Sequence, residues 1–137
     1  MIETHAFRLK PGEDLKNSIQ DYVTEFNIVA GWIASGIGSL VRCHIRFANQ
    51  PKGNIVGGFF EIITLSGTVS VNGSHLHISV SDSEGKIVSG HLLEGNIIYT
   101  TAEIILQETK DFVFIREKDH TTSWKELQVK KRDNYLL

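Results

Sequence analysis

A succession of short apolar segments separated by turn-forming residues most constrains the fold of this chain. The segments are residues 57–65, 67–72, 74–81 and 86–93. The separating residues are Ser66-Gly67, Asn72-Gly73 and a turn around Gly85. Asn-Gly is typical of tight hairpins, because both residues tolerate a positive φ. Connections this short favour antiparallel pairing of consecutive strands, so the sequence predicts an antiparallel or mixed sheet here.

One segment near the N-terminus has a helical period. A first strand is predicted over residues 2–9, and the acidic pair Glu13-Asp14 that follows is typical of a helix start. The apolar residues of the next stretch recur every three or four positions, at Leu15, Ile19, Tyr22, Val23 and Phe26. We expect one amphipathic helix that covers a face of the sheet. Further predicted strands at residues 40–47, 97–106 and 112–116 complete an α+β fold.

Length and composition are those of a single globular domain. The chain has 137 residues, of which 41% are hydrophobic and 22% charged, and this is enough to bury a core. We predict a domain over residues 1–117 and a polar tail over residues 118–137 that is a candidate for partial disorder. One cysteine, no signal-like N-terminus and no membrane-length apolar stretch lead us to expect a cytoplasmic protein without membrane contacts.

Three of the six histidines lie within 17 residues of one another, at His75, His77 and His91. Residues i and i+2 of a strand share a face, so His75 and His77 point the same way, and a return strand would bring His91 opposite one of them. Three neutral imidazoles at such spacing are the usual protein contribution to an open zinc site. The alternative is a polar sheet face that carries histidines. The remaining histidines, which lack clustered partners, are not expected to be ligands: His5, His44 and His120.

Four charged residues are further candidates for the site. Glu61 and Glu103 lie within apolar strands, where a carboxylate is costly unless it is paired or binds a metal. Each is a candidate fourth ligand, or a partner that orients a histidine. A structural hydrogen bond or a subunit contact is the alternative for both. Arg42 and Arg46 share one face of a predicted strand and are candidate contacts for an anion.

Several motifs, in a fixed order, resemble the plants-and-prokaryotes conserved (PPC) domain, in its stand-alone prokaryotic form. The motifs are residues 58–67, 73–82 and 90–95, with 8–9 and 12–15 upstream and 100–104 downstream. The resemblance spans about residues 4–116. It implies a strongly curved, mixed sheet with a helix packed against it, and a homotrimer. It also implies a zinc ion held by the residues that match His75, His77 and His91.

The resemblance also brings the label of a DNA-binding protein, because plant members join this domain to AT-hook motifs. An AT-hook requires an Arg-Gly-Arg core, and this chain has none. Its net charge of −2 does not replace that core, so we do not expect direct DNA binding. Besides the other subunits of a trimer and DNA, a small anionic ligand is a candidate partner.

An acidic residue followed by His-x-His and a third histidine also resembles, more distantly, the metal site of acetolactate decarboxylase. Two functions from different classes therefore stay open. The first is a trimeric zinc-binding module, of regulatory use, whose activity the sequence does not assign. The second is a zinc-dependent lyase or decarboxylase that acts on a small oxo- or hydroxy-acid. An open coordination position favours the second, since structural zinc is normally closed by four protein ligands.

Overall fold

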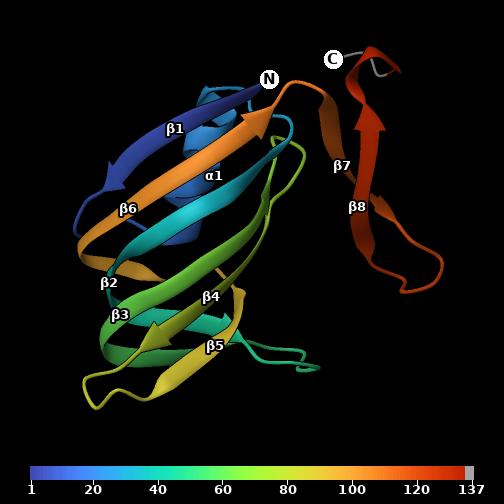
Figure 1. The fold of residues 1–137 in the computed structure, drawn as a ribbon. Coiled ribbons are helices and arrows are strands. Elements are labelled where there is room, and N and C mark those ends of the chain that lie inside the picture. Colours follow the sequence, from blue (N-terminus) through green and yellow to red (C-terminus); the bar gives the residue numbers. More distant parts are fainter. Residues whose placement is uncertain (135–137) are drawn as a thin grey trace.

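The computed structural model describes residues 1–134 and consists mainly of one large antiparallel sheet with a single α-helix (Figure 1). The elements are β1 (Ile2–Leu9), α1 (Leu15–Glu25), β2 (Gly31–Arg46), β3 (Asn54–Val69), β4 (His75–Ser81), β5 (Ile87–Leu92), β6 (Ile97–Thr109), β7 (Phe112–Lys118), β8 (Lys125–Lys131) and the short 3-10 helix η1 (Arg132–Asn134). The strand order of the large sheet is β1-β6-β2-β3-β4-β5, and every pairing in it is antiparallel. The predicted α+β class with a curved sheet is confirmed.

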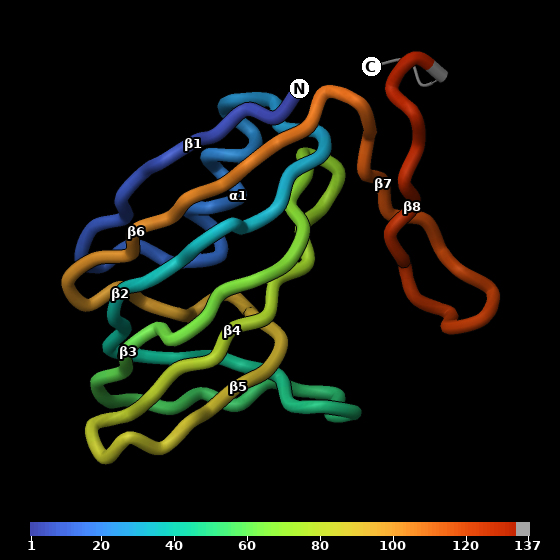
Figure 2. Tube along the Cα trace, in the orientation of Figure 1, coloured from blue at the N-terminus to red at the C-terminus, as the bar shows by residue number. Residues whose placement is uncertain are grey.

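The sheet curls because its two central strands are long and irregular. β2 and β3 have 16 residues each, and their pairing shifts register between Leu40 and Arg42. Such irregularities bend a strand and increase its twist. The far end of β2 therefore leaves β6 and pairs with β5, at Ile45↔Leu92 and Arg46↔His91 (Figure 2). This additional pairing brings the C-terminal end of β2 to the histidine-bearing edge of the sheet.

Helix α1 covers the side of β1, β6 and β2 that lies behind the sheet in Figure 1. Asp14 is its N-cap and accepts a hydrogen bond from the Asn17 backbone N–H, which satisfies one of the free donors at a helix start. Leu15, Ile19 and Val23 are fully buried and belong to the main core. The predicted amphipathic helix is thus confirmed. No helix within residues 1–134 is long and apolar enough to cross a membrane.

The break predicted at Ser66-Gly67 is absent, because β3 runs continuously through it and pairs with β4. Gly67 has φ +135°, and a Cβ atom there would lie 2.0 Å from the His75 carbonyl oxygen. The glycine therefore permits a close approach of two strands and does not end one. The Asn72-Gly73 turn between β3 and β4 is observed as predicted, with a hydrogen bond from the Gly73 N–H to the Ser70 carbonyl.

Part of the predicted polar tail, residues 118–137, forms the strand β8 and the 3-10 helix η1. β8 pairs with β7 in a separate hairpin, so the predicted boundary at residues 117 and 118 falls inside β7. Val113 and Ile115 of this hairpin form a small second core with Val29 and Val71. Every residue of β8 is exposed or half-buried, so its sequence shows no clear alternation, and the strand is defined by its pairing with β7. Residues 135–137 of the predicted tail lie outside the described residues.

Candidate metal centre

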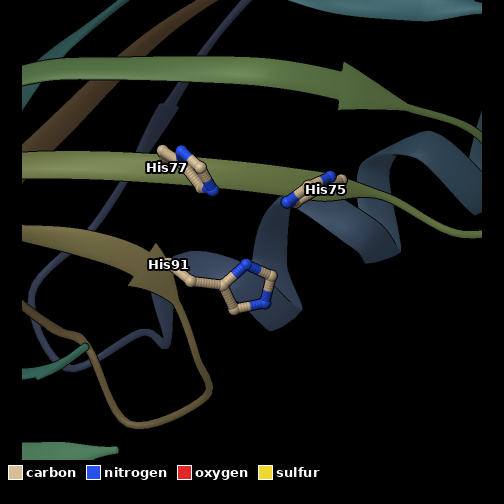
Figure 3. A group of neighbouring side chains, drawn as sticks. All are labelled: His75, His77 and His91. Atoms are coloured by element: carbon tan, nitrogen blue, oxygen red, sulfur yellow. The ribbon is translucent and has the colours of Figure 1, made fainter. Parts of the chain in front are cut away.

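Three histidine side chains converge at the edge formed by β4 and β5 (Figure 3). His75 and His77 come from β4, and His91 comes from β5, directly opposite His77. One ring nitrogen of each lies within 4.8 Å of one ring nitrogen of both others. The ring centroids are separated by 5.0, 5.1 and 5.8 Å. The hairpin thus directs the three imidazoles toward one point.

Local sequence explains why these side chains share a face. Leu76, Ile78 and Val80 alternate with the histidines of β4 and are buried in the core, which leaves the histidines on the opposite face. The turn to β5 is fixed by Asp82, whose carboxylate accepts hydrogen bonds from the backbone N–H groups of Glu84 and Lys86. These two features set the register that pairs His77 with His91.

The electrostatic environment keeps two of the imidazoles neutral. The pKa of His91 is lowered to about 4, first by burial, then by the positive charge of Arg46 and by the neighbouring imidazole of His75. Burial, followed by His77 and Arg116, also lowers the pKa of His75. At neutral pH both side chains therefore present a free nitrogen lone pair, which is the form that binds metal ions.

The geometry and the donor chemistry fit a divalent transition-metal ion. His91 Nδ1 is buried and has no hydrogen-bond partner among the described residues, which is costly for a polar atom unless it binds something. Ligand nitrogens of a tetrahedral zinc site lie about 3.4 Å apart, given zinc–nitrogen distances near 2.1 Å. Rotation of the histidine side chains, whose nitrogens now lie within 4.8 Å of one another, would bring them to that separation. When bound, such an ion supplies Lewis acidity at its remaining coordination position.

Two arginines flank the histidine cluster from opposite sides. Arg46 of β2 lies directly opposite His91 of β5 in the pairing of these two strands. The Arg116 guanidinium donates a hydrogen bond of 3.0 Å to Thr68 Oγ1, and Thr68 lies directly opposite His75. A cleft of about 540 Å³ lies between them and is closed on one side by the β7–β8 hairpin. It is lined by Arg46, Asn72, Gly73, Ser74, His75, His91, Arg116, Trp124, Lys125 and Glu126.

Residues 1–110 match the family model of the Plants and Prokaryotes Conserved (PCC) domain, which covers most of the chain. The chain belongs to the PCC-domain family. This is the family that the sequence motifs resemble, and the prediction is confirmed. The match ends before the β7–β8 hairpin, so the PCC domain contains the three histidines and Arg46, whereas Arg116 and Trp124 lie beyond it.

Relatives of this PCC domain occur both alone and within longer proteins. A hypothetical protein from Salmonella enterica is 32% identical and superimposes with a TM-score of 0.94, covering 96% of each chain. The bifunctional protein GlmU of a Synechococcus strain is 36% identical over 130 residues. That match covers 95% of this chain, but this chain spans only about a fifth of the length of GlmU. A metal-containing protein from Archaeoglobus fulgidus shares the fold, with 24% identity, a TM-score of 0.80, and coverage of 92% of this chain and 93% of that one.

Three of the charged residues predicted for the site lie elsewhere in the PCC domain. Glu61 is exposed and lies opposite Ser81, which is about 13 Å along β4 from His77 at the usual strand rise. Glu103 is exposed on β6, opposite Ile37, and two strands, β2 and β3, separate it from β4. Arg42 is exposed four residues before Arg46. Neither glutamate is therefore buried as the sequence suggested, and neither belongs to the histidine cluster of its own chain.

Sequence reasoning missed Arg116 and a second group of metal-binding residue types. Arg116 enters the cleft from a strand that pairs only with β8, and no local motif connects it to the histidines. Glu3, His5 and Glu108 also present ligand atoms within 4.8 Å of one another. The sequence alone predicts that His5 is not a ligand. The other two histidines lie outside both groups: His44 contacts the Glu94 carbonyl through Nδ1, and His120 is exposed.

Proposed function

We propose that this protein is a cytoplasmic, homotrimeric PCC-domain module that binds zinc through His75, His77 and His91 and receives a small anionic ligand beside it. The observation that carries the proposal is the convergence of three histidine nitrogens, two of them on imidazoles held neutral, between two arginines. A regulatory role fits a small domain of this kind: binding of the ligand at the site would change how the protein interacts with a partner.

Zinc is the ion that this donor set favours. Imidazole nitrogens suit zinc, copper, iron and nickel, and three of them with an open fourth position are typical of zinc. The Archaeoglobus relative with the same fold is described as metal-containing, which supports a metal in this family. No Asp, Glu or Cys of residues 1–134 joins the three histidines in one cluster, so a further ligand from outside the chain would complete the shell.

An anion is the ligand that the surroundings favour. Arg46, Arg116 and Lys125 contribute three positive charges to the cleft, and Glu126 contributes one negative charge. Adding a divalent cation to this set leaves a strong excess of positive charge. A carboxylate or phosphate that reaches the metal offsets this excess and accepts hydrogen bonds from a guanidinium, which carries a planar fork of donors.

The arginines can be tested with the cobalt-substituted protein, whose visible absorption reports ligands that enter the metal shell. Oxalate, lactate and phosphate serve as probes, and we expect at least one of them to change the spectrum. Arg46→Ala and Arg116→Ala should each weaken that ligand about tenfold, the scale of a charge-assisted hydrogen bond at a partly exposed site. Arg42→Ala, an arginine of the same strand outside the cleft, is the matched control. An anion affinity that neither cleft variant changes would contradict the proposal.

A second candidate function is a zinc-dependent lyase or decarboxylase that acts on a small oxo- or hydroxy-acid. The open coordination position favours it, because catalytic zinc sites keep a place for water or substrate. The same panel of acids, incubated with the zinc-loaded protein and followed for substrate loss and carbon dioxide release, separates the two functions. Turnover that disappears when Arg46 is replaced would make the protein an enzyme. Binding without turnover favours the module.

Exposed apolar side chains on three neighbouring strands support a subunit interface. Ile37, Phe59, Ile63, Tyr99 and Ile105 lie on β2, β3 and β6 and alternate with buried core residues, so they share the sheet face away from α1. The rings of Phe59 and Tyr99 are 4.9 Å apart, although 60% of Phe59 is exposed. An apolar patch of this kind is typical of a protein contact surface.

Phe59→Asp is expected to convert the trimer into monomers, because it would place a charge within a buried apolar contact. Light scattering coupled to gel filtration measures the mass directly. Ile87→Asp, which alters an equally exposed apolar residue on β5 outside this patch, should leave the trimer intact. A wild-type protein with the mass of one chain at micromolar concentration would rule out this interface.

A further inference from the structure

A second group of ligand-type side chains lies at the opposite edge of the large sheet from the three histidines. It consists of Glu3 and His5 on β1 and Glu108 on β6, and the register of these strands sets Glu3 directly opposite Glu108. His5 Nε2 is 3.4 Å from Glu108 Oε2, and the ligand atoms of all three residues lie within 4.8 Å of one another. β1 begins the strand order and β4 and β5 end it, so the two clusters are separate sites.

The atoms that face one another in this group are buried and lack hydrogen bonds. The Glu108 side chain is 4% exposed and the His5 side chain 10% exposed. Glu108 Oε2 and His5 Nε2 have no hydrogen-bond partner among the described residues. The two atoms form an ion pair only when His5 is protonated, and otherwise burying them without a hydrogen bond costs free energy that a cation bound to both would offset. The arrangement therefore provides a cation site of mixed nitrogen and oxygen ligands.

The other nitrogen of the His5 ring is held as it is in a metal ligand. His5 Nδ1 lies 2.9 Å from the Tyr22 hydroxyl of α1, and the Tyr22 ring stacks on Phe7 at 3.9 Å. Metal-binding histidines almost always use their second nitrogen in such a contact, which fixes the tautomer and the ring orientation. In the tautomer that carries its proton on Nδ1 and donates it to Tyr22, the Nε2 lone pair is free for a cation beside Glu108.

A lysine supplies the positive charge of this group in the described structure. Lys110 Nζ contacts Glu108 Oε1 and lies 3.7 Å from Glu3 Oε2, and its side chain is 52% exposed. It does not contact Glu108 Oε2, the oxygen that faces His5. A half-exposed lysine on a flexible stem can move into solvent at little cost, and a divalent ion balances two carboxylates fully where the lysine balances only one.

We propose that Glu3, His5 and Glu108 form a second metal site, which binds a divalent transition-metal ion in competition with the Lys110 ammonium group. One imidazole and two carboxylates favour ions such as Zn²⁺, Mn²⁺ or Co²⁺ over Ca²⁺, which prefers oxygen ligands alone. The ion fastens the edge strand β1 to β6. Through the contact between His5 and Tyr22, it also connects both strands to α1.

Cobalt binding to a protein that lacks the first cluster isolates the second site. In the His77→Ala/His91→Ala background, we expect titration calorimetry and visible absorption to detect one Co²⁺ per chain. Adding His5→Asn or Glu108→Gln should remove this ion. Glu103→Gln, an exposed carboxylate of the same strand, is the matched control and should leave it bound. Absence of cobalt binding in this background, or binding that survives both cluster variants, would overturn the proposal.

Replacement of Lys110 is a second test, in which cobalt binding is expected to become tighter. A gain in affinity cannot result from misfolding. Lys110→Met removes the competing charge and should tighten cobalt binding about tenfold, on the scale of one nearby charge in a partly screened site. A purely structural ion pair between Lys110 and Glu108 gives a different result. In that case Lys110→Met lowers the melting temperature, measured without metal, and leaves cobalt affinity unchanged or weaker, which contradicts a metal site here.

Discussion

Replacing His77 and His91 together by alanine is expected to remove the zinc ion from the first cluster, because one imidazole of three cannot hold it. The affinity for zinc should fall by at least about 1,000-fold, equivalent to on the order of 4 kcal/mol. Competition with a chromophoric chelator measures this loss, and elemental analysis of the purified protein counts zinc per chain. His75 remains in the variant, so any residual weak binding belongs to a single imidazole.

His120→Ala is the control for the zinc experiment, since it removes an exposed histidine far from the cluster in the sequence. It should bind zinc as the wild type does. A double variant that keeps tight zinc binding, with only one ion bound in the wild type, would show that the three histidines are a polar sheet face. Because the second cluster is expected to bind metal as well, the comparison is made at zinc concentrations that saturate one ion per chain.

Gly67→Ala is expected to destabilise the protein by about 3 kcal/mol or more, the range of a severe backbone and packing conflict. The new Cβ would lie 2.0 Å from the His75 carbonyl oxygen and 2.9 Å from Leu76 Cα, and both are backbone atoms that cannot turn aside. The φ of +135° adds conformational strain. Urea unfolding measures the change in the free energy of unfolding, and zinc affinity should fall as β4 moves.

Gly85→Ala separates backbone strain from steric conflict. Gly85 also has a positive φ, of +82°, but a Cβ atom there meets nothing within 4 Å. It should cost only about 1 kcal/mol, the scale of placing a residue with a side chain in the left-handed region. Equal losses for the two variants would mean that the approach of β3 to β4 at Gly67 is not tight, and that strain alone accounts for the effect.

Elements that depend on neighbouring residues could be predicted from the sequence. The helix that begins after Asp14 has its cap and its apolar stripe within a dozen residues. The β4–β5 hairpin has its turn and its alternation within 17 residues, and for this reason His75, His77 and His91 could be grouped by their spacing alone. Local propensity and periodicity carry enough information for such units.

Features that depend on distant pairings could not be predicted in this way. A glycine such as Gly67 is interpreted as a turn unless the strand beside it is known, because the same missing side chain serves both uses. Arg116 reaches the cleft through a hydrogen bond to Thr68, 48 residues away. The group of Glu3, His5 and Glu108 exists only because β1 pairs with β6 across more than a hundred residues. The exposure of Glu61 depends on which face of the curved sheet α1 covers.

The hairpin of β7 and β8 lies beyond the part of the chain that matches the PCC family, yet it forms one wall of the cleft beside the three histidines. The side chains around the cleft therefore come from both sides of this boundary, with Arg46 before it and Arg116 and Trp124 after it. A change in this hairpin would therefore alter the wall of the cleft and also the small core that Val113 and Ile115 form with Val29. The shape of the cleft and the stability of the fold thus depend on the same hairpin.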